Sequence, residues 1–413
     1  MTRDIIVAGG GAAGVLAAGR AAQMGARVWL MEKNRLLGCK LRITGKGRCN
    51  VTNAGELEQF IENYSGAGRF LYSAFHRFFN LELCRLLESY SVPLKTERGG
   101  RVFPASDRAA DVAEALEKYA VTQGVQVLTS TEVSALSLSP EGGINGVRAG
   151  GRFWPADAVV LATGGLSYPA TGCTGDGYRW AGTLGHHVTE LRPALVPLEI
   201  REPWPGALSG LALKNVEAGL WEGARCLRRA FGEMLFARFG VTGPIILLLS
   251  RDVPEKPAGA LTLKLDLKPA LSEEVLDRRL LRDLLKFQRR QMKNALRELL
   301  PKALIPVVLR HSGIPEDVFA DQLTKAQRQA LVHTLKGLPM TVSGTRPVAE
   351  AVVTRGGVSL KEVNPRTMAS RITPGLYFAG EVLDIDGRTG GYNLQAAFST
   401  GWLAGESAAR GPG

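Results

Sequence analysis

Apolar and polar residues alternate in blocks at the start of the chain. The apolar run at 5–8 is typical of a buried strand, and alanine-rich sequence with helical spacing extends from the glycines at 9–14 to Gly25. A second apolar run at 28–31 predicts another strand. A strand, a tight turn, a helix and a strand in this order form the repeating unit of a doubly wound parallel sheet.

The same α/β pattern continues as far as residue 190. The helix predicted at 109–123 begins close to Ser106 and Asp107, and either side chain is suited to cap it. The other predicted elements are helical structure at 68–90, strands at 98–107, 125–128 and 132–138, a hairpin through 141–146, an apolar strand at 158–165 and a helix at 178–184.

The pattern changes near residue 191, where four closely spaced prolines interrupt the alternation of strands and helices. The elements predicted after this point are antiparallel strands around Leu198 and at 211–221, 225–236 and 259–267, an amphipathic helix or helix pair at 271–300, helical pieces to 336, and a strand-like stretch at 340–354. A strand at 376–379 and a helix near Asn393 return to the first pattern. The sequence therefore predicts an α/β fold interrupted by an inserted region.

The turn after the first strand has the spacing GxGxxG. Gly9 permits the tight turn, Gly11 allows the backbone to approach a pyrophosphate, and Gly14 allows close packing of helix and strand. The helix start then directs free N–H groups towards the phosphates. Glu32 follows the second strand at the distance expected for a carboxylate that binds ribose hydroxyls. Together these residues predict a dinucleotide site.

Two later stretches add to this site. The strand at 158–165 ends in ATGG, over which a backbone or a cofactor can pass without obstruction. The stretch 375–401 contains a strand, then Gly380 and Glu381, and then GGYN before an alanine-rich helix. In flavin enzymes such an acid binds the ribityl chain, and a helix N-terminus stabilises negative charge at the pyrimidine end of the ring. FAD therefore explains three stretches, whereas NAD alone would leave the last without a function.

Composition narrows the class of protein. A chain of 413 residues with 45% hydrophobic content is long enough to bury the cores of two or three domains. It has neither an apolar run of membrane-spanning length nor a basic leader, which predicts a soluble cytoplasmic protein. Five cysteines without CxxC spacing predict reduced thiols and no metal site.

Basic residues are in excess, with a formal net charge of +12. The stretch 33–53, predicted as a loop, carries six basic residues and no acid up to Arg48, which suits the phosphates of a dinucleotide or its ring. The segment 272–310 has ten basic and five acidic residues, so it presents either a solvated basic face or a platform for a phosphate backbone. The excess favours a polyanionic partner, although a generally basic proteome also explains it.

Six motifs spread over nearly the whole chain resemble the BaiN/RdsA-type family of NAD(P)/FAD-dependent oxidoreductases. They are GGGAAG at 9–14, GKGRCNVTN at 45–53, GRVFPASD at 100–107, ATGGLSYPATGCTGDGY at 162–178, GEMLFARFGVTGP at 232–244 and AGEVLDIDGRTGGYNLQ at 379–395. The first is common among flavoproteins, whereas GRCNVTN and EVLDIDGRTGGYN are far more specific. Mild departures from the family pattern occur at Lys46 and Cys173.

The resemblance implies a Rossmann-like FAD-binding domain of the glutathione reductase type, interrupted by an insertion with an antiparallel, barrel-like part and a helical part. The implied boundaries are 1–190 plus 345–413 for the FAD-binding domain, 191–270 plus 337–344 for the β-rich domain and 271–336 for the basic helical subdomain. The residues implied to bind FAD are Gly9, Gly11, Ala12, Ala13, Gly14, Glu32, Lys33, Lys40, Gly47, Arg48, Val133, Ala162, Thr163, Gly164, Gly380, Glu381, Gly390, Gly391, Tyr392, Asn393 and Leu394. NAD(P)H would be a transient electron donor, without a second GxGxxG to hold it.

A flavin passes a hydride to an electron-poor C=C bond, and the neighbouring carbon must then receive a proton. Cys49, in the GRCN turn, is the first candidate for the acid, followed by Tyr168 and Tyr392. The alternative interpretation of Cys49 is a buried small hydrophobe.

The family includes reductases of steroid-like enones and enzymes that make dihydrouridine in large-subunit (23S) ribosomal RNA, and both reactions reduce a C=C bond. The net charge favours RNA, because an unstacked uridine must be held at the flavin while Lys and Arg bind phosphates. The leading hypothesis is therefore NAD(P)H-driven reduction of a ribosomal RNA uridine. The alternatives are a small-molecule ene reductase, an amine oxidase that produces peroxide, and a non-catalytic, flavin-bearing RNA-binding protein.

Overall fold

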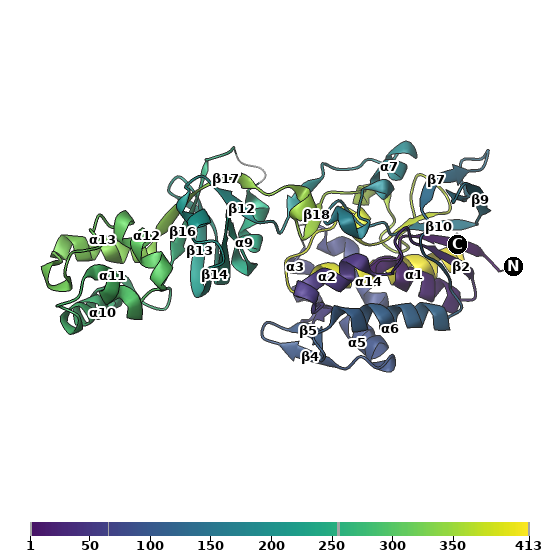
Figure 1. Ribbon diagram of the computed structural model, residues 1–413. Coiled ribbons are helices and arrows are strands. Elements are labelled where there is room, and N and C mark those ends of the chain that lie inside the picture. The colour runs from purple at the N-terminus through teal and green to yellow at the C-terminus, as the bar shows by residue number, and fades with distance from the viewer. Residues whose placement is uncertain (1, 65, 254–256, 412–413) are drawn as a thin grey trace. The chain divides into compact units, whose positions relative to one another are not determined.

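The computed structural model describes residues 2–64, 66–253 and 257–411, and the chain forms two compact units (Figure 1). Unit 1 combines Met1–Arg192 with Ala351–Gly413, and unit 2 is the continuous segment Pro193–Glu350. Each unit encloses its own hydrophobic core. The chain therefore leaves unit 1 after Arg192 and returns to it once.

A parallel five-stranded sheet with the order β19-β10-β1-β2-β6 forms the centre of unit 1. Its strands are β1 (Asp4–Ala8), β2 (Arg27–Met31), β6 (Gln126–Leu128), β10 (Ala158–Leu161) and β19 (Leu376–Phe378). Every residue of β10 is buried, which is why its sequence is a continuous apolar run. Since all five strands are parallel, their carboxyl ends share one edge, where doubly wound sheets bind their ligands.

Helices and two small antiparallel sheets complete unit 1. The helices are α1 (Ala12–Gln23), α2 (Cys39–Gly47), α3 (Leu57–Glu62), α4 (Tyr72–Arg77), α5 (Asn80–Ser89), α6 (Ala109–Thr122), α7 (Asp176–Thr183) and α14 (Tyr392–Arg410). One sheet contains β3 (Thr52–Asn53), β4 (Leu94–Glu97) and β5 (Arg101–Pro104), and the other β7 (Val133–Leu138), β8 (Ile144–Ala149) and β9 (Arg152–Pro155). The short strand β18 is Val353–Arg355.

The start and the end of the chain meet in the packing of α1 against α14 (Figure 1). Gly401 of α14 lies against the backbone of Ala13, and Gly405 lies against the backbone of Ala17, where a Cβ would overlap the carbonyl groups. The two glycines advance along α14 in the same direction as their partners along α1, so the helices are parallel. This close contact fixes the axial position of one helix start relative to the other.

Two local predictions for unit 1 are wrong. The stretch 33–53, predicted as a loop, contains helix α2. Neither Ser106 nor Asp107 caps α6, whose N-cap is Arg108 without a capping side-chain hydrogen bond. Asp107 instead forms an ion pair with Arg48, 2.6 Å long, so a contact with a distant segment replaces the local one.

Unit 2 consists of a closed antiparallel barrel with the order β12-β15-β14-β13-β16-β17 and a group of helices (Figure 1). Alternate residues of β16 are buried, as expected for a strand with one face inside a barrel. Barrel and helices share one hydrophobic core. The strands are β12 (Leu198–Ile200), β13 (Ala212–Glu222), β14 (Arg225–Ala237), β15 (Gly240–Thr242), β16 (Leu261–Asp266) and β17 (Leu338–Thr345). The helices are α8 (Trp204–Ala207), α9 (Pro244–Leu249), α10 (Glu273–Lys286), α11 (Met292–Ala295), α12 (Ile305–His311) and α13 (Lys325–Lys336).

The predicted fold class is confirmed: a Rossmann-like parallel sheet is interrupted by an antiparallel barrel and helices. One stretch differs in detail, because the segment predicted as strand-like at 340–354 is divided between β17 and β18. The remaining short strand, β11 (Arg192–Ala194), lies where the chain passes from unit 1 to unit 2. Among the described residues no helix has both the length and the apolar character needed to cross a membrane.

A buried histidine gives unit 1 a pH-dependent stability. His186 Nε2 lies 2.8 Å from Ser370 Oγ, and its Nδ1 lies 3.3 Å from a carboxylate oxygen of Glu362. Burial lowers the pKa of His186 below its usual value near 6.5, while Glu362 acts in the opposite direction. The folded protein therefore binds this proton less readily than the unfolded chain. Above the pKa that His186 has in the unfolded chain, this histidine does not reduce the free energy of unfolding. The free energy of unfolding then decreases as the pH falls through the lower pKa of His186 in the folded protein.

We expect the melting temperature to decrease from pH 7.5 to pH 5.5 more steeply in the wild-type protein than in His186→Gln, which lacks the titrating group. The variant also loses the native contacts of the imidazole, so its melting temperature is lower at both pH values. The slope against pH is therefore the quantity to compare. Thermal unfolding followed by circular dichroism measures both slopes, and equal slopes would contradict the assignment.

Candidate cofactor and active site

The glycine-rich turn between β1 and α1 is open on one side. Gly9 has a φ of +106°, and a Cβ there would collide with the backbone of Ala162 at the end of β10. Gly11 is the N-cap of α1 and has no side chain that could accept a hydrogen bond from the first N–H groups of the helix. No described atom lies within 4 Å of the position that its Cβ would occupy. The unpaired N–H groups of the first helical turn are therefore available to an anion.

Glu32 joins this turn to the end of β2. Its side chain is buried, Oε2 accepts a hydrogen bond from Gly10 N at 2.7 Å, and Oε1 accepts from the backbone and side-chain nitrogens of Asn34 at 2.8 and 2.7 Å. A carboxylate has about four lone-pair positions, so these bonds leave capacity for a ribose hydroxyl. The Thr131 N–H donates to Glu32 O at 2.9 Å, which brings the segment leading to Val133 beside the same strand end.

The end of β10 provides a polar atom without a partner. Ala162, Thr163 and Gly164 follow the strand at the ligand-binding edge, and Gly164 has a φ of +75°. The Thr163 hydroxyl is buried and has no hydrogen-bond partner among the described residues. Such a group costs free energy unless water or a ligand satisfies it. This hydroxyl faces Gly177 of α7, where a Cβ would overlap it, so the unpaired atom lies against the protein at this point.

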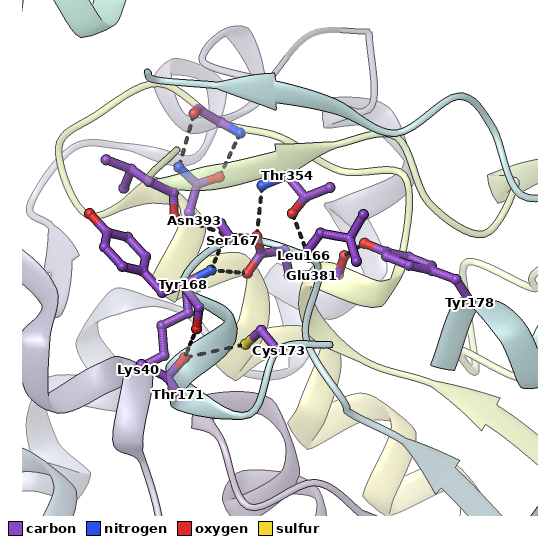
Figure 2. Close-up of polar contacts among 12 residues, drawn as sticks. Lys40, Leu166, Ser167, Tyr168, Thr171, Cys173, Tyr178, Thr354, Glu381 and Asn393 are labelled. Atoms are coloured by element: carbon purple, nitrogen blue, oxygen red, sulfur yellow. Dashed lines mark hydrogen bonds and ion pairs between the residues drawn. The ribbon is translucent and has the colours of Figure 1, made fainter. Parts of the chain in front are cut away.

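Glu381, which follows β19, is the centre of a polar network (Figure 2). Its Oε2 accepts a hydrogen bond from Lys40 Nζ of α2 at 2.6 Å. Its Oε1 accepts from the Thr354 backbone N–H at 2.8 Å and from Ser167 Oγ at 3.1 Å. Lys40 Nζ also donates to Ser167 Oγ at 2.6 Å. The network fixes four segments that are far apart in the sequence at the point where β19 ends.

Glycines also form the start of α14. Gly390 and Gly391 have φ values of +128° and +98°, and Gly391 is an N-cap without a side-chain capping bond from the described residues. Tyr392, Asn393 and Leu394 form the first turn, and their N–H groups have no partner within the helix. At the end of β19, Gly380 N donates to Thr400 Oγ1 of α14 at 2.9 Å. The last strand of the sheet and the last helix are therefore fixed to each other.

The GRCNVTN segment holds the start of α14 in place, a role that was not predicted from the sequence. The Asn53 side chain, on β3, donates to the carbonyl groups of Gly390 at 3.1 Å and Gly99 at 2.9 Å. Thr52 Oγ1 donates to Gln395 Oε1 at 2.6 Å, and a Cβ on Gly391 would overlap the Thr52 backbone. Thr52 and Asn53 are both buried, and in the sequence only their place at the end of the GRCNVTN motif distinguishes them.

The three predicted proton donors differ in burial. Cys49 is 0% exposed, and burial raises the pKa of its thiol to about 12, although a hydrogen bond with the Thr44 side chain acts in the opposite direction. The Tyr392 ring packs edge-on against the Phe60 ring, with 4.8 Å between the two ring centroids, and burial raises the pKa of Tyr392. Tyr168 is half-buried. Both Tyr168 and Cys49 have a positive φ, +54° and +59°, so backbone strain does not distinguish these two candidates.

Several basic residues of the stretch 33–48 bind carboxylates from distant segments. Lys33 Nζ lies 2.7 Å from Asp176 of α7. Arg48 forms ion pairs with Asp107 and with Glu97 of β4, and its guanidinium lies over the Phe103 ring. Gly47, beside Arg48, has a φ of +83° and no described atom near its Cβ position. Much of the positive charge of this stretch is therefore balanced within unit 1.

The starts of α1 and α14 have the spacing of an extended dinucleotide. Because Gly401 lies level with Ala13, nine residues of α14 extend beyond this point, against one residue of α1. At a rise of 1.5 Å per residue, the two helix starts are separated by about 12 Å along their common direction. FAD has a diphosphate and a flavin ring joined by a ribityl chain, so each helix start suits one charged group. The open space at Gly11 agrees with this fit.

Comparison with known proteins gives the same assignment. Residues 3–407 match the family model for the HI0933-like protein Rossmann domain. The chain is 34% identical over 419 residues to the 3-dehydro-bile acid delta(4,6)-reductase of Clostridium scindens, with 98% of this chain and 99% of the relative covered. It is 32% identical over 412 residues to the ribosomal RNA dihydrouridine synthase of Escherichia coli, with 97% and 96% covered. The structure of 3-ketosteroid-delta4-(5alpha)-dehydrogenase from Rhodococcus jostii has a similar fold, with a TM-score of 0.54, 17% identity, and 99% and 97% covered.

The family match extends over both units, and the two curated relatives align along almost their whole length. These findings confirm the resemblance predicted from the six motifs. The chain belongs to the HI0933-like family, whose members of the BaiN/RdsA type are FAD-dependent oxidoreductases.

Proposed function

We propose that the protein uses FAD to reduce a C=C bond, with a uridine of large-subunit ribosomal RNA as the substrate and NAD(P)H as the electron donor. The observation that carries this proposal is the convergence of Gly11, Glu32, Glu381 and the start of α14 at one edge of the sheet. These groups suit, in that order, a diphosphate, a ribose, a ribityl chain and a ring that gains negative charge. A nicotinamide dinucleotide has no ribityl chain.

FAD, when bound, supplies hydride chemistry at the edge of the sheet. The N–H groups at the start of α14 favour negative charge at the pyrimidine edge of the ring. Asn53 keeps this helix start in position through its bond to the Gly390 carbonyl. We assign the proton that the substrate carbon receives to Tyr168, because its side chain is partly exposed, whereas Cys49 is fully buried. The third candidate, Tyr392, packs its ring against Phe60, and burial raises its pKa.

Two observations favour RNA as the substrate. Unit 2 contains 24 Lys or Arg residues and 17 Asp or Glu residues, so it carries a net charge of +7 out of the formal +12 of the chain. The Escherichia coli relative is named a ribosomal RNA dihydrouridine synthase. Reduction of a uridine requires an unstacked base at the flavin and cations that bind the surrounding phosphates. A basic inserted unit suits that requirement.

A small-molecule enone is the second candidate substrate. The relative from Clostridium scindens is named a bile acid reductase, and its identity to this chain is slightly higher, at 34%. Reduction of an enone would use the same cofactor site and the same proton donor. The two candidates therefore differ in substrate recognition and share their chemistry.

The experiment uses the FAD-loaded protein without oxygen. NADH or NADPH is added first, and bleaching of the flavin absorbance identifies the donor. Transcribed 23S ribosomal RNA or a steroid enone is then added. We expect the RNA to restore the absorbance and to gain two hydrogen atoms at a uridine, measured by mass spectrometry of its nucleosides. Recovery with the enone alone would overturn the RNA substrate, and failure of both nucleotides to bleach the flavin would overturn the donor.

We expect Tyr168→Phe to slow reoxidation of the flavin by the acceptor at least about tenfold, because only this half-reaction needs the proton. Reduction by NAD(P)H should be unchanged. In Cys49→Ala both half-reactions should stay within about twofold of the wild-type rates, because a thiol with a pKa of about 12 buried away from the surface is not needed as the acid. Stopped-flow absorbance separates the two half-reactions. If flavin reoxidation were slow in Cys49→Ala and had the wild-type rate in Tyr168→Phe, the proton donor would be Cys49 and not Tyr168.

A further inference from the structure

The segment that begins in α10 has a large excess of cations. From Arg278 to Arg310 there are ten basic residues and two acids. Both acids already have partners, because Asp283 lies 3.6 Å from Arg279 and Glu298 lies 2.9 Å from Lys286. The remaining cations of this segment therefore have no carboxylate of their own segment to balance them.

Four exposed members of this segment form what we call the basic face: Arg282, Arg289, Lys293 and Arg297. They flank the ion pair of Lys286 with Glu298, which fastens the end of α10 to the segment 296–298. Arg282 lies about one turn before Lys286, and Arg297 is adjacent to Glu298. None of the four forms an ion pair or a side-chain hydrogen bond with another residue in the described ranges. The ion pair thus holds several unpaired cations in one region of unit 2.

Acidic residues also occur on a neighbouring element. The loop 315–322 is bonded to α11 through its backbone, since Met292 N donates to Val318 O at 2.8 Å. It carries Glu316, Asp317 and Asp321, and no ion pair joins these acids to the basic face within the described chain. The loop therefore reduces the local potential without occupying the guanidinium groups.

We propose that the basic face binds the phosphate backbone of RNA; the proposal rests on the function proposed above and assigns the holding of the substrate to unit 2. Three of the four residues are arginines, whose planar fork matches a phosphate with two hydrogen bonds. RNA is favoured over an anionic membrane because the main apolar stripe of α10, Leu276, Leu280 and Leu284, is buried in the core of unit 2. A helix that lies in a membrane surface needs such a stripe free. Only Val275, Leu281 and Leu285 remain exposed among the apolar residues of this helix.

The test compares two triple variants of the full-length FAD-loaded protein. R282Q/R289Q/R297Q removes three cations of the basic face. R85Q/K118Q/R366Q removes three exposed cations of unit 1 that likewise have no ion pair in the described chain, so both variants lose the same charge. Fluorescence anisotropy with a labelled RNA stem-loop, from 50 to 200 mM salt, measures the affinity and its salt dependence. Vesicles of anionic phospholipid are the second probe.

We expect the first variant to bind the stem-loop at least about tenfold more weakly than wild type. The slope of log K against log salt concentration, which is negative in the wild type, should become less steep by about two to three in this variant. Flavin absorbance and bleaching by the nucleotide should be unchanged. The unit 1 variant should stay close to wild type. Equal weakening in both variants would overturn the proposal, because it would reflect net charge alone. Binding of wild type to vesicles but not to RNA would overturn it as well.

Failure of this inference is distinguishable from failure of the proposed function. If the first variant reduces ribosomal RNA uridine as efficiently as wild type at 150 mM salt, the basic face is not the RNA surface while the reaction stands. If the basic face binds the stem-loop but wild type leaves every uridine unchanged, the reaction is wrong while the surface stands. Each result therefore decides one of the two statements.

Discussion

Gly11→Ala is expected to fold like the wild-type protein and to bind FAD far more weakly. The Cβ would meet no described atom within 4 Å, and the φ of −80° at this position is ordinary for alanine. The added methyl group instead points into the space that the diphosphate would occupy at the start of α1. Overpacking of a close contact costs about 1–3 kcal/mol, which corresponds to a roughly 5- to 150-fold higher Kd for FAD.

The matched control is Gly182→Ala in α7. The Cβ of this residue would also meet no described atom within 4 Å, but it lies near the end of a helix rather than in the glycine-rich turn. We expect unchanged FAD affinity and a slightly higher stability, since alanine is the better helix former. Flavin fluorescence titration of the apoproteins gives Kd, and circular dichroism confirms the fold. Normal FAD binding by Gly11→Ala, or by the bulkier Gly11→Val, would contradict the placement of the diphosphate.

The parts of the site that follow from local sequence were predictable. The apolar runs that became β1 and β2, the glycines between β1 and α1, and the placement of Glu32 all lie within one short segment whose spacing reflects one supersecondary unit. The last strand and the start of α14 were predicted for the same reason, because glycines and an acid follow an apolar run. Such units have the same geometry wherever they occur, so their pattern can be interpreted without the rest of the chain.

The partners of charged residues were not predictable in the same way. Lys40 was predicted to belong to the cofactor site, but nothing near it in the sequence indicated that its amine would bind Glu381, more than 300 positions away. Asp107 was predicted as a helix cap, and the distant Arg48 decided its conformation instead. Tertiary contacts of this kind depend on the packing of elements, which local periodicity does not encode.

The two family motifs judged most specific in the sequence turn out to contact each other. Asn53 ends GRCNVTN, and Gly390 belongs to EVLDIDGRTGGYN; the amide of the first donates to the carbonyl of the second. Asn53 is buried, and its Oδ1 accepts a hydrogen bond from Gly55 N at 3.0 Å, so the whole amide group is used within the protein. These contacts explain why the segment needs an amide: a carboxylate could accept the bond but could not donate the other two.

Asn53→Asp is therefore expected to destabilise the start of α14 by about 3 kcal/mol or more, because a buried carboxylate without a compensating charge would face the carbonyl groups of Gly390 and Gly99. FAD should be released at a lower temperature than in the wild-type protein, as measured by the rise in flavin fluorescence. The decrease in release temperature relative to wild type should be smaller at pH 5 than at pH 8, since a protonated carboxyl group again donates one hydrogen bond. Asn63→Asp is the control, because the side-chain amide of Asn63 donates only to Gln59 O, in an exposed position. The free energy of unfolding of this variant should stay within about 0.5 kcal/mol of the wild-type value. Equal release temperatures for the two variants would show that Asn53 does not position the helix.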